Sequence, residues 1–202
     1  MGALIVFWSH ALAAMLFASL LIWRLGEASR QPAQRLLLAA FALTACWAWL
    51  TAVMPGGPLV GFAESARNLV WIGLLHSLAS ARDERQHGVR LVYGAVAAVI
   101  GMQLIAGVLG LLSPSAGIAQ ASLILRITTA AGALVLVHNF YGQAAPASRS
   151  HIRLAMIGLA SMWVYDLNLY TMAYLGAPNA RWLMQWRGLA VALTAPLLAL
   201  AA

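Results

Sequence analysis

The chain has 202 residues, of which 63% are hydrophobic and only 8% are charged. A soluble domain carries about 25% charged residues, so the composition excludes an ordinary soluble protein and indicates an integral membrane protein. The net charge of +7 comes from 12 arginines without a single lysine. Because these arginines mostly lie in short links between apolar runs, we reject a nucleic-acid-binding surface. The missing lysine also excludes a retinal protein, which needs a Schiff-base lysine.

Seven apolar runs approach or exceed the roughly 20 residues that a helix needs to cross a bilayer. They are residues 3–23, 35–53, 60–80, 90–112, 119–141, 152–174 and 182–202. The first run has no basic residue before it and exceeds the ~7–15 apolar residues of a signal peptide, so we expect a spanning helix there. The sequence therefore predicts one all-α domain over residues 1–202, a bundle of seven transmembrane helices.

The links between these runs are short and rich in turn-forming or polar residues. Segments 54–58 (MPGGP) and 113–117 (SPSAG) read as tight turns, and 176–179 (GAPN) as the last one. Segments 82–87 and 142–153 read as polar loops. Each link therefore joins two antiparallel helices.

Arginines are distributed unevenly between these links, and this predicts the orientation. The alternate links contain only Arg181, whereas the first, third and fifth contain eight arginines: Arg24, Arg30, Arg35, Arg82, Arg85, Arg90, Arg149 and Arg153. By the positive-inside rule, we place the N-terminus outside and Ala202 on the cytoplasmic side. Five tryptophans then fall near the two interfaces: Trp8, Trp47, Trp49 and Trp182 outside, and Trp23 inside. No basic residue follows the last run, so we expect a fragment of a longer chain.

Five charged residues lie inside the predicted spans: Glu64, Arg67, Arg126, Asp166 and Arg187. A charge at the centre of a spanning helix costs about 2.5–3.5 kcal/mol on insertion scales, so each needs a partner or a watery cavity. With a rise of about 1.5 Å per residue, all five fall in the outer half of the bilayer. We therefore expect them to meet.

Helical spacing places further polar residues on the same faces as these charges. The three faces contain Glu64, Arg67, Asn68 and Trp71; Ser122, Arg126 and Thr129; and Trp163, Asp166, Tyr170 and Tyr174. We expect Glu64 to pair with Arg67 within one helix, and Asp166 to pair with Arg126 or Arg187. The predicted polar cluster, which binds a ligand or ties helices together, is Glu64, Arg67, Asn68, Arg126, Asp166, Tyr170 and Arg187.

Three roles are open for this cluster: interhelical ion pairs that lock the bundle, a water-filled outer cavity that recognises a small or anionic signal, or a proton or ion path. His10 lies at a depth from which it can join. We expect Gly94 and Gly101 to be packing contacts. We expect neither a metal nor a cofactor, because His76 and His138 near the inner face lack a carboxylate neighbour.

A small membrane transporter and a membrane-embedded enzyme that uses the buried Arg/Asp/Glu cluster remain alternatives. Cys46, Arg126 and His138 suggest peptidase chemistry, but His138 lies about 18 Å along the helix from Arg126, too far for a triad. We therefore predict no catalytic residue in this stretch, and read Cys46 as a small buried hydrophobe.

Five segments resemble the N-terminal membrane region of PrsK-type sensor histidine kinases of bacterial PEP-CTERM/exosortase systems. The segments are 64–71 (ESARNLVW), 123–126 (LILR), 165–170 (YDLNLY), 187–188 (RG) and 196–202 (PLLALAA). They follow the family's order along nearly the whole chain. This chain has His138–Asn139 where the family tends to have an acidic residue followed by asparagine.

The resemblance implies a signal-input domain of a two-component system in the bacterial inner membrane, tied to exopolysaccharide and protein-sorting genes. In the family, further helices, a GAF-type domain and kinase domains follow this region, so the parent protein would be a histidine kinase. The resemblance implies dimerisation through those regions outside this stretch. It assigns no signal and no sensory residue.

Overall fold

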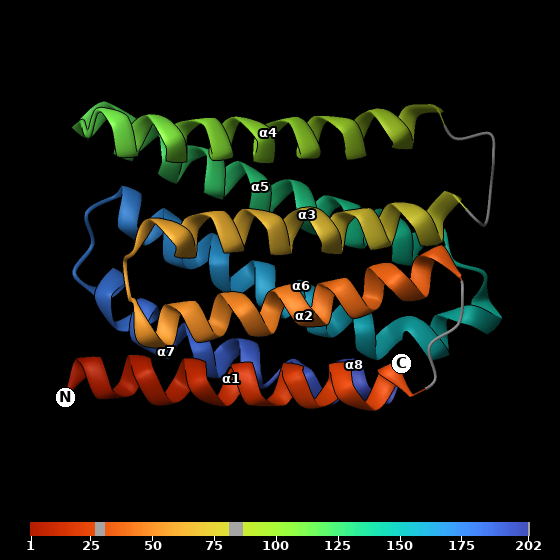
Figure 1. Ribbon diagram of the computed structural model, residues 1–202. Helices are drawn as coiled ribbons and strands as arrows, with labels where there is room; N and C mark the ends of the chain where they lie inside the picture. The colour runs from red at the N-terminus through yellow and green to blue at the C-terminus, as the bar shows by residue number, and fades with distance from the viewer. Residues whose placement is uncertain (27–30, 81–86, 202) are drawn as a thin grey trace.

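The computed structural model describes residues 1–26, 31–80 and 87–201. Within these ranges the chain forms helices and no strand, and the helices lie lengthwise in one elongated bundle (Figure 1). The helices are α1 (Gly2–Leu25), α2 (Pro32–Val53), α3 (Pro58–Ser80), α4 (His87–Leu112), α5 (Ala116–Gly142), α6 (Pro146–Tyr174), α7 (Asn179–Ala192) and α8 (Ala195–Ala201).

Five stretches among the described residues are long and apolar enough to cross a membrane. They are Gly2–Leu25, Pro32–Val53, Arg90–Leu112, Ala116–Gly142 and Asn179–Ala201. The prediction of an all-helical chain with several helices able to cross a membrane is therefore confirmed. The helices α3 and α6 also have the length of a span, 23 and 29 residues. Their hydropathy is lower because they carry buried charged residues.

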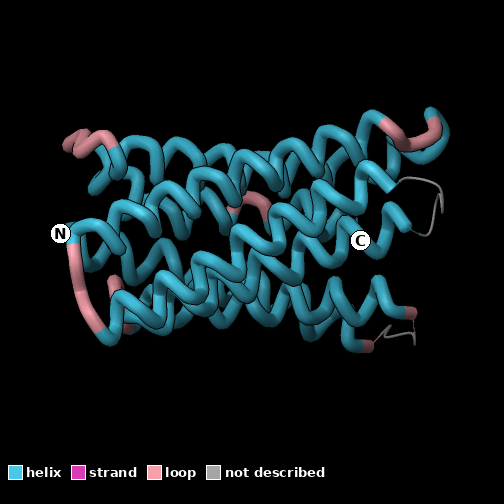
Figure 2. Tube along the Cα trace, turned by 90° about the horizontal axis from the view of Figure 1, so that it is seen from above, coloured by secondary structure: helices cyan, strands magenta, loops and turns pink. Residues whose placement is uncertain are grey.

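The helices form a closed ring in sequence order. Each helix from α1 to α7 packs against the next one along the chain, and α7 returns to pack against α1. Figure 2 shows the same lengthwise arrangement from above. One hydrophobic core fills the interior, with Phe17, Phe41, Leu75 and Met162 among its fully buried side chains. Burying a side chain of this size is worth about 1.5–3 kcal/mol relative to exposure in water.

Several helices begin earlier than predicted because proline and serine start them. Pro32 and Pro146 occupy the first turns of α2 and α6, where the N–H that proline lacks would be unpaired anyway. Ser115 caps α5 by accepting a hydrogen bond from the N–H of Ile118. The prediction of a polar loop over 142–153 is therefore wrong for residues 146–153, which form the first turns of α6.

Two glycines with positive φ make the tight turns at one end of the bundle. Gly176 (φ +66°) ends α6: its N–H donates to the carbonyl of Ala173, and the N–H of Ala177 donates to that of Met172. These two bonds define a Schellman motif, whose left-handed residue favours glycine. Gly56 (φ +79°) serves the turn between α2 and α3. The predicted turns at 54–58 and 176–179 are confirmed.

The predicted last helix, 182–202, is broken into α7 and α8. Pro196 has no N–H to donate to the carbonyl four residues earlier, that of Ala192, so the helical hydrogen-bond ladder is interrupted there. The hydroxyl of Thr194 donates instead to the carbonyl of Val191 at 2.7 Å. The helix α8 then packs against α6 and α1. Ala202 lies outside the described residues.

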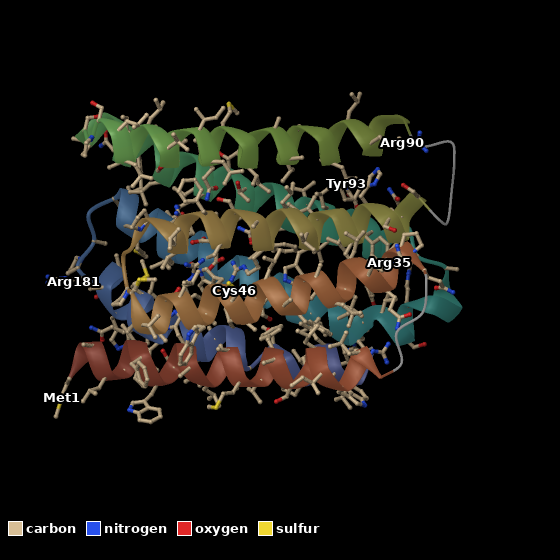
Figure 3. The ribbon with its side chains drawn as sticks, in the orientation of Figure 1. Met1, Arg35, Cys46, Arg90, Tyr93 and Arg181 are labelled. Atoms are coloured by element: carbon tan, nitrogen blue, oxygen red, sulfur yellow. The ribbon has the colours of Figure 1, made fainter. Side chains whose placement is uncertain are left out.

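The two ends of the bundle differ in charge. Figure 3 shows Arg35 and Arg90 at one end, and Arg181 with Met1 at the other. This agrees with the arrangement from which we predict the orientation. Arg30, Arg82 and Arg85, which also enter that prediction, lie outside the described residues, as does segment 82–86 of the predicted polar loop.

Two predictions about packing are wrong. Cys46 is exposed on the outer surface of α2, because the inward face of this helix is set by Thr44 and residues one turn further along, and Cys46 lies roughly opposite them. Gly94 and Gly101 of α4 are not close contacts, since a Cβ at either would meet nothing within 4 Å. The tight approach to α4 is made instead by Gly132 of α5, against Val96.

Candidate functional site: a buried polar core

The five charged residues from the predicted spans meet inside the bundle, as predicted. They come from α3 (Glu64, Arg67), α5 (Arg126), α6 (Asp166) and α7 (Arg187). We call these five, together with Asn68 and Tyr170, the polar core. Each is at most 5% exposed, except Arg126, whose side chain is 20% exposed. The structure therefore brings together all seven residues of the predicted cluster.

Arg187 lies at the centre and holds both carboxylates. Its Nε donates to Oδ1 of Asp166 at 2.7 Å. Its Nη2 and Nη1 donate to Oε1 and Oε2 of Glu64 at 2.7 and 3.2 Å. Planar guanidinium groups favour such two-point contacts, which are about twice as strong as neutral hydrogen bonds. The predicted pairing of Asp166 with Arg187 is confirmed.

Glu64 collects the largest number of these donors. Besides Arg187, it accepts hydrogen bonds from Nη1 of Arg126 and from the hydroxyl of Tyr170. Arg126 also donates to the Tyr170 hydroxyl at 2.8 Å. The approach of Arg126 depends on Gly61 of α3, because a Cβ there would lie 3.1 Å from Nη2 of Arg126. Arg126 thus reaches Glu64 from α5 by passing close to Gly61, where α3 has no side chain.

The predicted pair of Glu64 with Arg67 within α3 is not formed. Arg67 donates instead across the bundle, through Nη2, to Asp166 at 3.0 Å, and also to Asn68 at 3.2 Å. The reason is that Arg126 and Arg187 already occupy both oxygens of Glu64, so Arg67 takes the second oxygen of Asp166. The alternative pairing of Asp166 with Arg126 is not formed, because both Asp166 oxygens are held by Arg67 and Arg187.

Trp47 of α2 is an unpredicted member of the site. It is fully buried, so its predicted place in the outer aromatic belt is wrong. The guanidinium carbons of Arg67 and Arg187 lie 4.2 and 4.7 Å from its ring centroid. Cation–π contacts shielded from water contribute about 2 kcal/mol. The other four predicted belt residues, Trp8, Trp49, Trp182 and Trp23, are at least half exposed.

A neutral polar network continues from the core toward α4. Gln103 donates to the hydroxyl of Ser65 at 2.9 Å, and the hydroxyl of Thr129 lies 3.5 Å from the Gln103 carbonyl oxygen. Gln103 is 4% exposed. Sequence reasoning missed it, although a lone glutamine within the apolar run 90–112 is itself a signal for an interhelical contact.

Two buried tryptophans extend the core on its other sides. Trp71 donates from Nε1 to the hydroxyl of Thr44 at 3.1 Å. The Nε1 of Trp163 lies 3.4 Å from the side-chain oxygen of Asn68. On the predicted face of α6, Trp163, Asp166 and Tyr170 are buried, whereas Tyr174 is 43% exposed. The face is therefore correct except at its last turn.

The histidines take different places. His10 of α1 reaches the core through Trp47, with ring centroids 5.6 Å apart, and its Nδ1 lies 2.9 Å from the carbonyl oxygen of Val6. His76 packs edge-on against Tyr93, with ring centroids 5.1 Å apart. Among the described residues, no group of three or more His, Cys, Asp or Glu side chains is arranged to hold a metal ion.

The burial of the polar core bears on its role. With Glu64, Arg67 and Asp166 at most 2% exposed, the geometry favours interhelical ion pairs over an open, water-filled cavity. Ligand binding by these residues stays a prediction. The chemistry that the arrangement supports directly is the exchange of partners between two carboxylates and three guanidinium groups.

Replacing Tyr170 with phenylalanine is expected to lower the free energy of unfolding by about 1–3 kcal/mol. The change removes a donor to Glu64 and an acceptor for Arg126, and hydrogen bonds to charged groups contribute this much. Denaturant unfolding in detergent, followed by tryptophan fluorescence, measures the loss. Tyr174→Phe is the matched control: it lies one turn further along α6 and is exposed, so we expect a change within about 0.5 kcal/mol. Equal losses for the two variants would contradict the role of Tyr170.

Comparisons with known proteins give no family assignment. No protein-family model, no curated protein and no solved structure matches this chain.

Proposed function

We propose that this chain is the membrane signal-input domain of a two-component sensor histidine kinase of the PEP-CTERM/exosortase type. In this proposal α3 and α6 also span the bilayer, so that the bundle crosses it seven times. The N-terminus is outside the bacterial inner membrane, and the chain continues from α8 into cytoplasmic kinase domains. The resemblance in sequence and the asymmetry of the loop arginines support this placement.

The observation that carries the proposal is that each buried carboxylate is shared between arginines of different helices. Glu64 is held by Arg126 and Arg187, and Asp166 by Arg67 and Arg187. Networks of this kind have alternative pairings that differ by single hydrogen bonds, and so provide an element with two discrete arrangements. A signal acts on such an element by binding one arrangement more tightly than the other.

The path from the core to the output runs through α7. Arg187 joins both carboxylates, and the break at Leu193 and Thr194 separates α7 from α8. A change of partner at Arg187 therefore shifts α7, and the break lets α8 change its angle to the bundle. In the proposal, this movement is what the kinase domains receive.

The experiment is a phosphorylation assay on the full-length gene product in inner-membrane vesicles from its host. Wild-type protein is expected to incorporate radioactive phosphate from ATP on a histidine. We expect Asp166→Asn to change the rate at least several-fold, because Arg67 and Arg187 lose their shared carboxylate. The control is Asn168→Ala on the same helix, whose exposed side chain donates to the carbonyl of Val164 within that helix; we expect an unchanged rate.

Two outcomes would overturn the proposal. One is a full-length product without a kinase domain, or without phosphate incorporation. The other is an Asp166→Asn protein that is folded and present at the wild-type level but phosphorylates at the wild-type rate. In that case the polar core ties helices together and takes no part in signalling.

A further inference from the structure

The polar core carries one positive charge more than its carboxylates balance. Three arginines from three helices face two carboxylates, and all the carboxylate oxygens are already engaged by arginines. A lone charge in the bilayer interior is unfavourable. Buried charges are therefore expected to be paired, and one positive charge of the polar core has no counter-charge.

The unpaired part of this charge is located on Arg67. This side chain is fully buried and uses only Nη2 to reach Asp166 and Asn68. Across the described part of the chain, Nε and Nη1 of Arg67 have no hydrogen-bond partner. By contrast, Arg187 uses all three of its nitrogens, and Arg126 is partly exposed at its side chain.

A second unpartnered donor lies directly beside this guanidinium. Trp47 is fully buried, and within the described ranges its Nε1 also has no hydrogen-bond partner. The Arg67 guanidinium carbon lies 4.2 Å from the Trp47 ring centroid. The Nδ1 of His10 faces the Val6 carbonyl oxygen and therefore carries the proton, so Nε2, which also has no hydrogen-bond partner within the described ranges, is an acceptor and not a further donor. This neutral nitrogen cannot balance the charge of Arg67. Arginine and indole N–H groups are donors only, so what they need is an acceptor.

We propose that a small monovalent anion of halide size binds inside the bundle at the unpaired side of Arg67. It accepts hydrogen bonds from the Arg67 guanidinium and from Nε1 of Trp47. The anion neutralises the excess charge and accepts hydrogen bonds from donors that are unfavourable when buried without a partner. Arg67 and Trp47 are fully buried, so the site excludes large anions. This is a constitutive structural ligand, separate from any signal.

The test is the anion dependence of thermal unfolding of the purified chain in detergent. Sodium chloride is titrated against sodium gluconate at constant ionic strength, with sodium acetate as a third arm that separates a halide site from a small-carboxylate site. Wild-type protein is expected to show a saturable rise in melting temperature with chloride, roughly 3–6 °C at ten times the dissociation constant. Gluconate is expected to give no rise.

The variants are chosen so that loss of folding does not hide the result. Arg67→Lys keeps the charge opposite Asp166 but removes the unpartnered guanidinium nitrogens, so the chloride increment should vanish. Trp47→Phe keeps the aromatic ring and removes only the N–H, so the increment should shrink. The matched control, Arg126→Lys, changes an arginine of the same core that has other partners, and its increment should equal that of the wild type.

Bromide provides a direct readout, because its anomalous scattering in crystals of the wild-type protein should give a peak within hydrogen-bonding distance of Arg67. A melting temperature that does not depend on chloride would overturn the proposal, as would an equal increment in Arg67→Lys, which indicates a general salt effect. A rise with acetate and not with chloride would replace the halide by a carboxylate. None of these measurements needs a signalling output, so failure here leaves the proposed function standing.

Discussion

Replacing Arg187 with methionine is expected to lower the free energy of unfolding by about 3–5 kcal/mol, the largest loss for any single arginine of this chain. Among the described residues, Arg187 is the only one that binds both Glu64 and Asp166. Its removal leaves two buried carboxylates short of donors, and breaking a buried pair on one side costs this much. Methionine fills most of the volume of the arginine side chain, so the loss in the free energy of unfolding reflects the removal of the charge.

Thermal unfolding in detergent, with size-exclusion chromatography to check that the variant is folded at low temperature, measures this loss. Arg181→Met is the control, because Arg181 is exposed at the start of the same helix, and we expect a change within about 0.5 kcal/mol. Equal stability of Arg187→Met and the wild type would contradict the central place of Arg187 in the polar core.

Replacing Gly188 with leucine is expected to separate α1 from α7. A Cβ on Gly188 would lie 2.5 Å from the backbone nitrogen of His10 and 2.5 Å from the carbonyl carbon of Ser9. Because both atoms belong to the α1 backbone, no side-chain rotation relieves the contact. Overpacking typically costs about 1–3 kcal/mol, and we expect at least the upper end. The shift would also break the 3.0 Å hydrogen bond from the Ser9 hydroxyl to the carbonyl of Gln185.

Gly94→Leu on α4 is the matched control for this substitution. A Cβ at Gly94 meets nothing within 4 Å, and leucine is a better helix former than glycine by almost 1 kcal/mol. We therefore expect Gly94→Leu to unfold at or slightly above the wild-type temperature, and Gly188→Leu well below it. A similar effect of both substitutions would show that α1 and α7 do not meet closely at Gly188.

Much of the fold could be predicted because the hydrophobic pattern of a membrane protein is dictated by bilayer thickness. The seven apolar runs correspond to the observed helices, with α7 and α8 sharing the last run. Helix starts were less predictable, since a proline reads as a breaker although it is well suited to the first turn, as at Pro32 and Pro146. The break before Pro196 follows from the same missing N–H.

The members of the site were predictable because charges in a bilayer must converge, but their pairing was not. Spacing along α3 put Glu64 and Arg67 within reach of each other. Which partner each takes depends on how α5, α6 and α7 lie around them, which no local pattern specifies. The polar core is therefore predictable as a set of residues, while its hydrogen bonds are a property of the tertiary structure.

The errors in the site concern residues whose role depends on the direction they face. Trp47 and Trp49 both suit a membrane interface, yet only Trp49 is exposed, whereas Trp47 lies under two guanidinium groups. Cys46, which directly precedes Trp47 in sequence, faces outward. Assigning faces on α2 requires a polar residue that marks the inner side. Thr44 is the best such mark, because its hydroxyl meets Trp71.

The most direct measurement of the polar core is a double-mutant cycle between Glu64→Gln and Arg187→Met, with unfolding free energies measured in detergent. If the two side chains are bound to each other inside the bundle, each single change leaves a buried charge without its partner. The double variant removes both, so it should be less destabilised than the sum of the single variants by about 1–3 kcal/mol. Additivity within about 0.5 kcal/mol would contradict the buried ion-pair core.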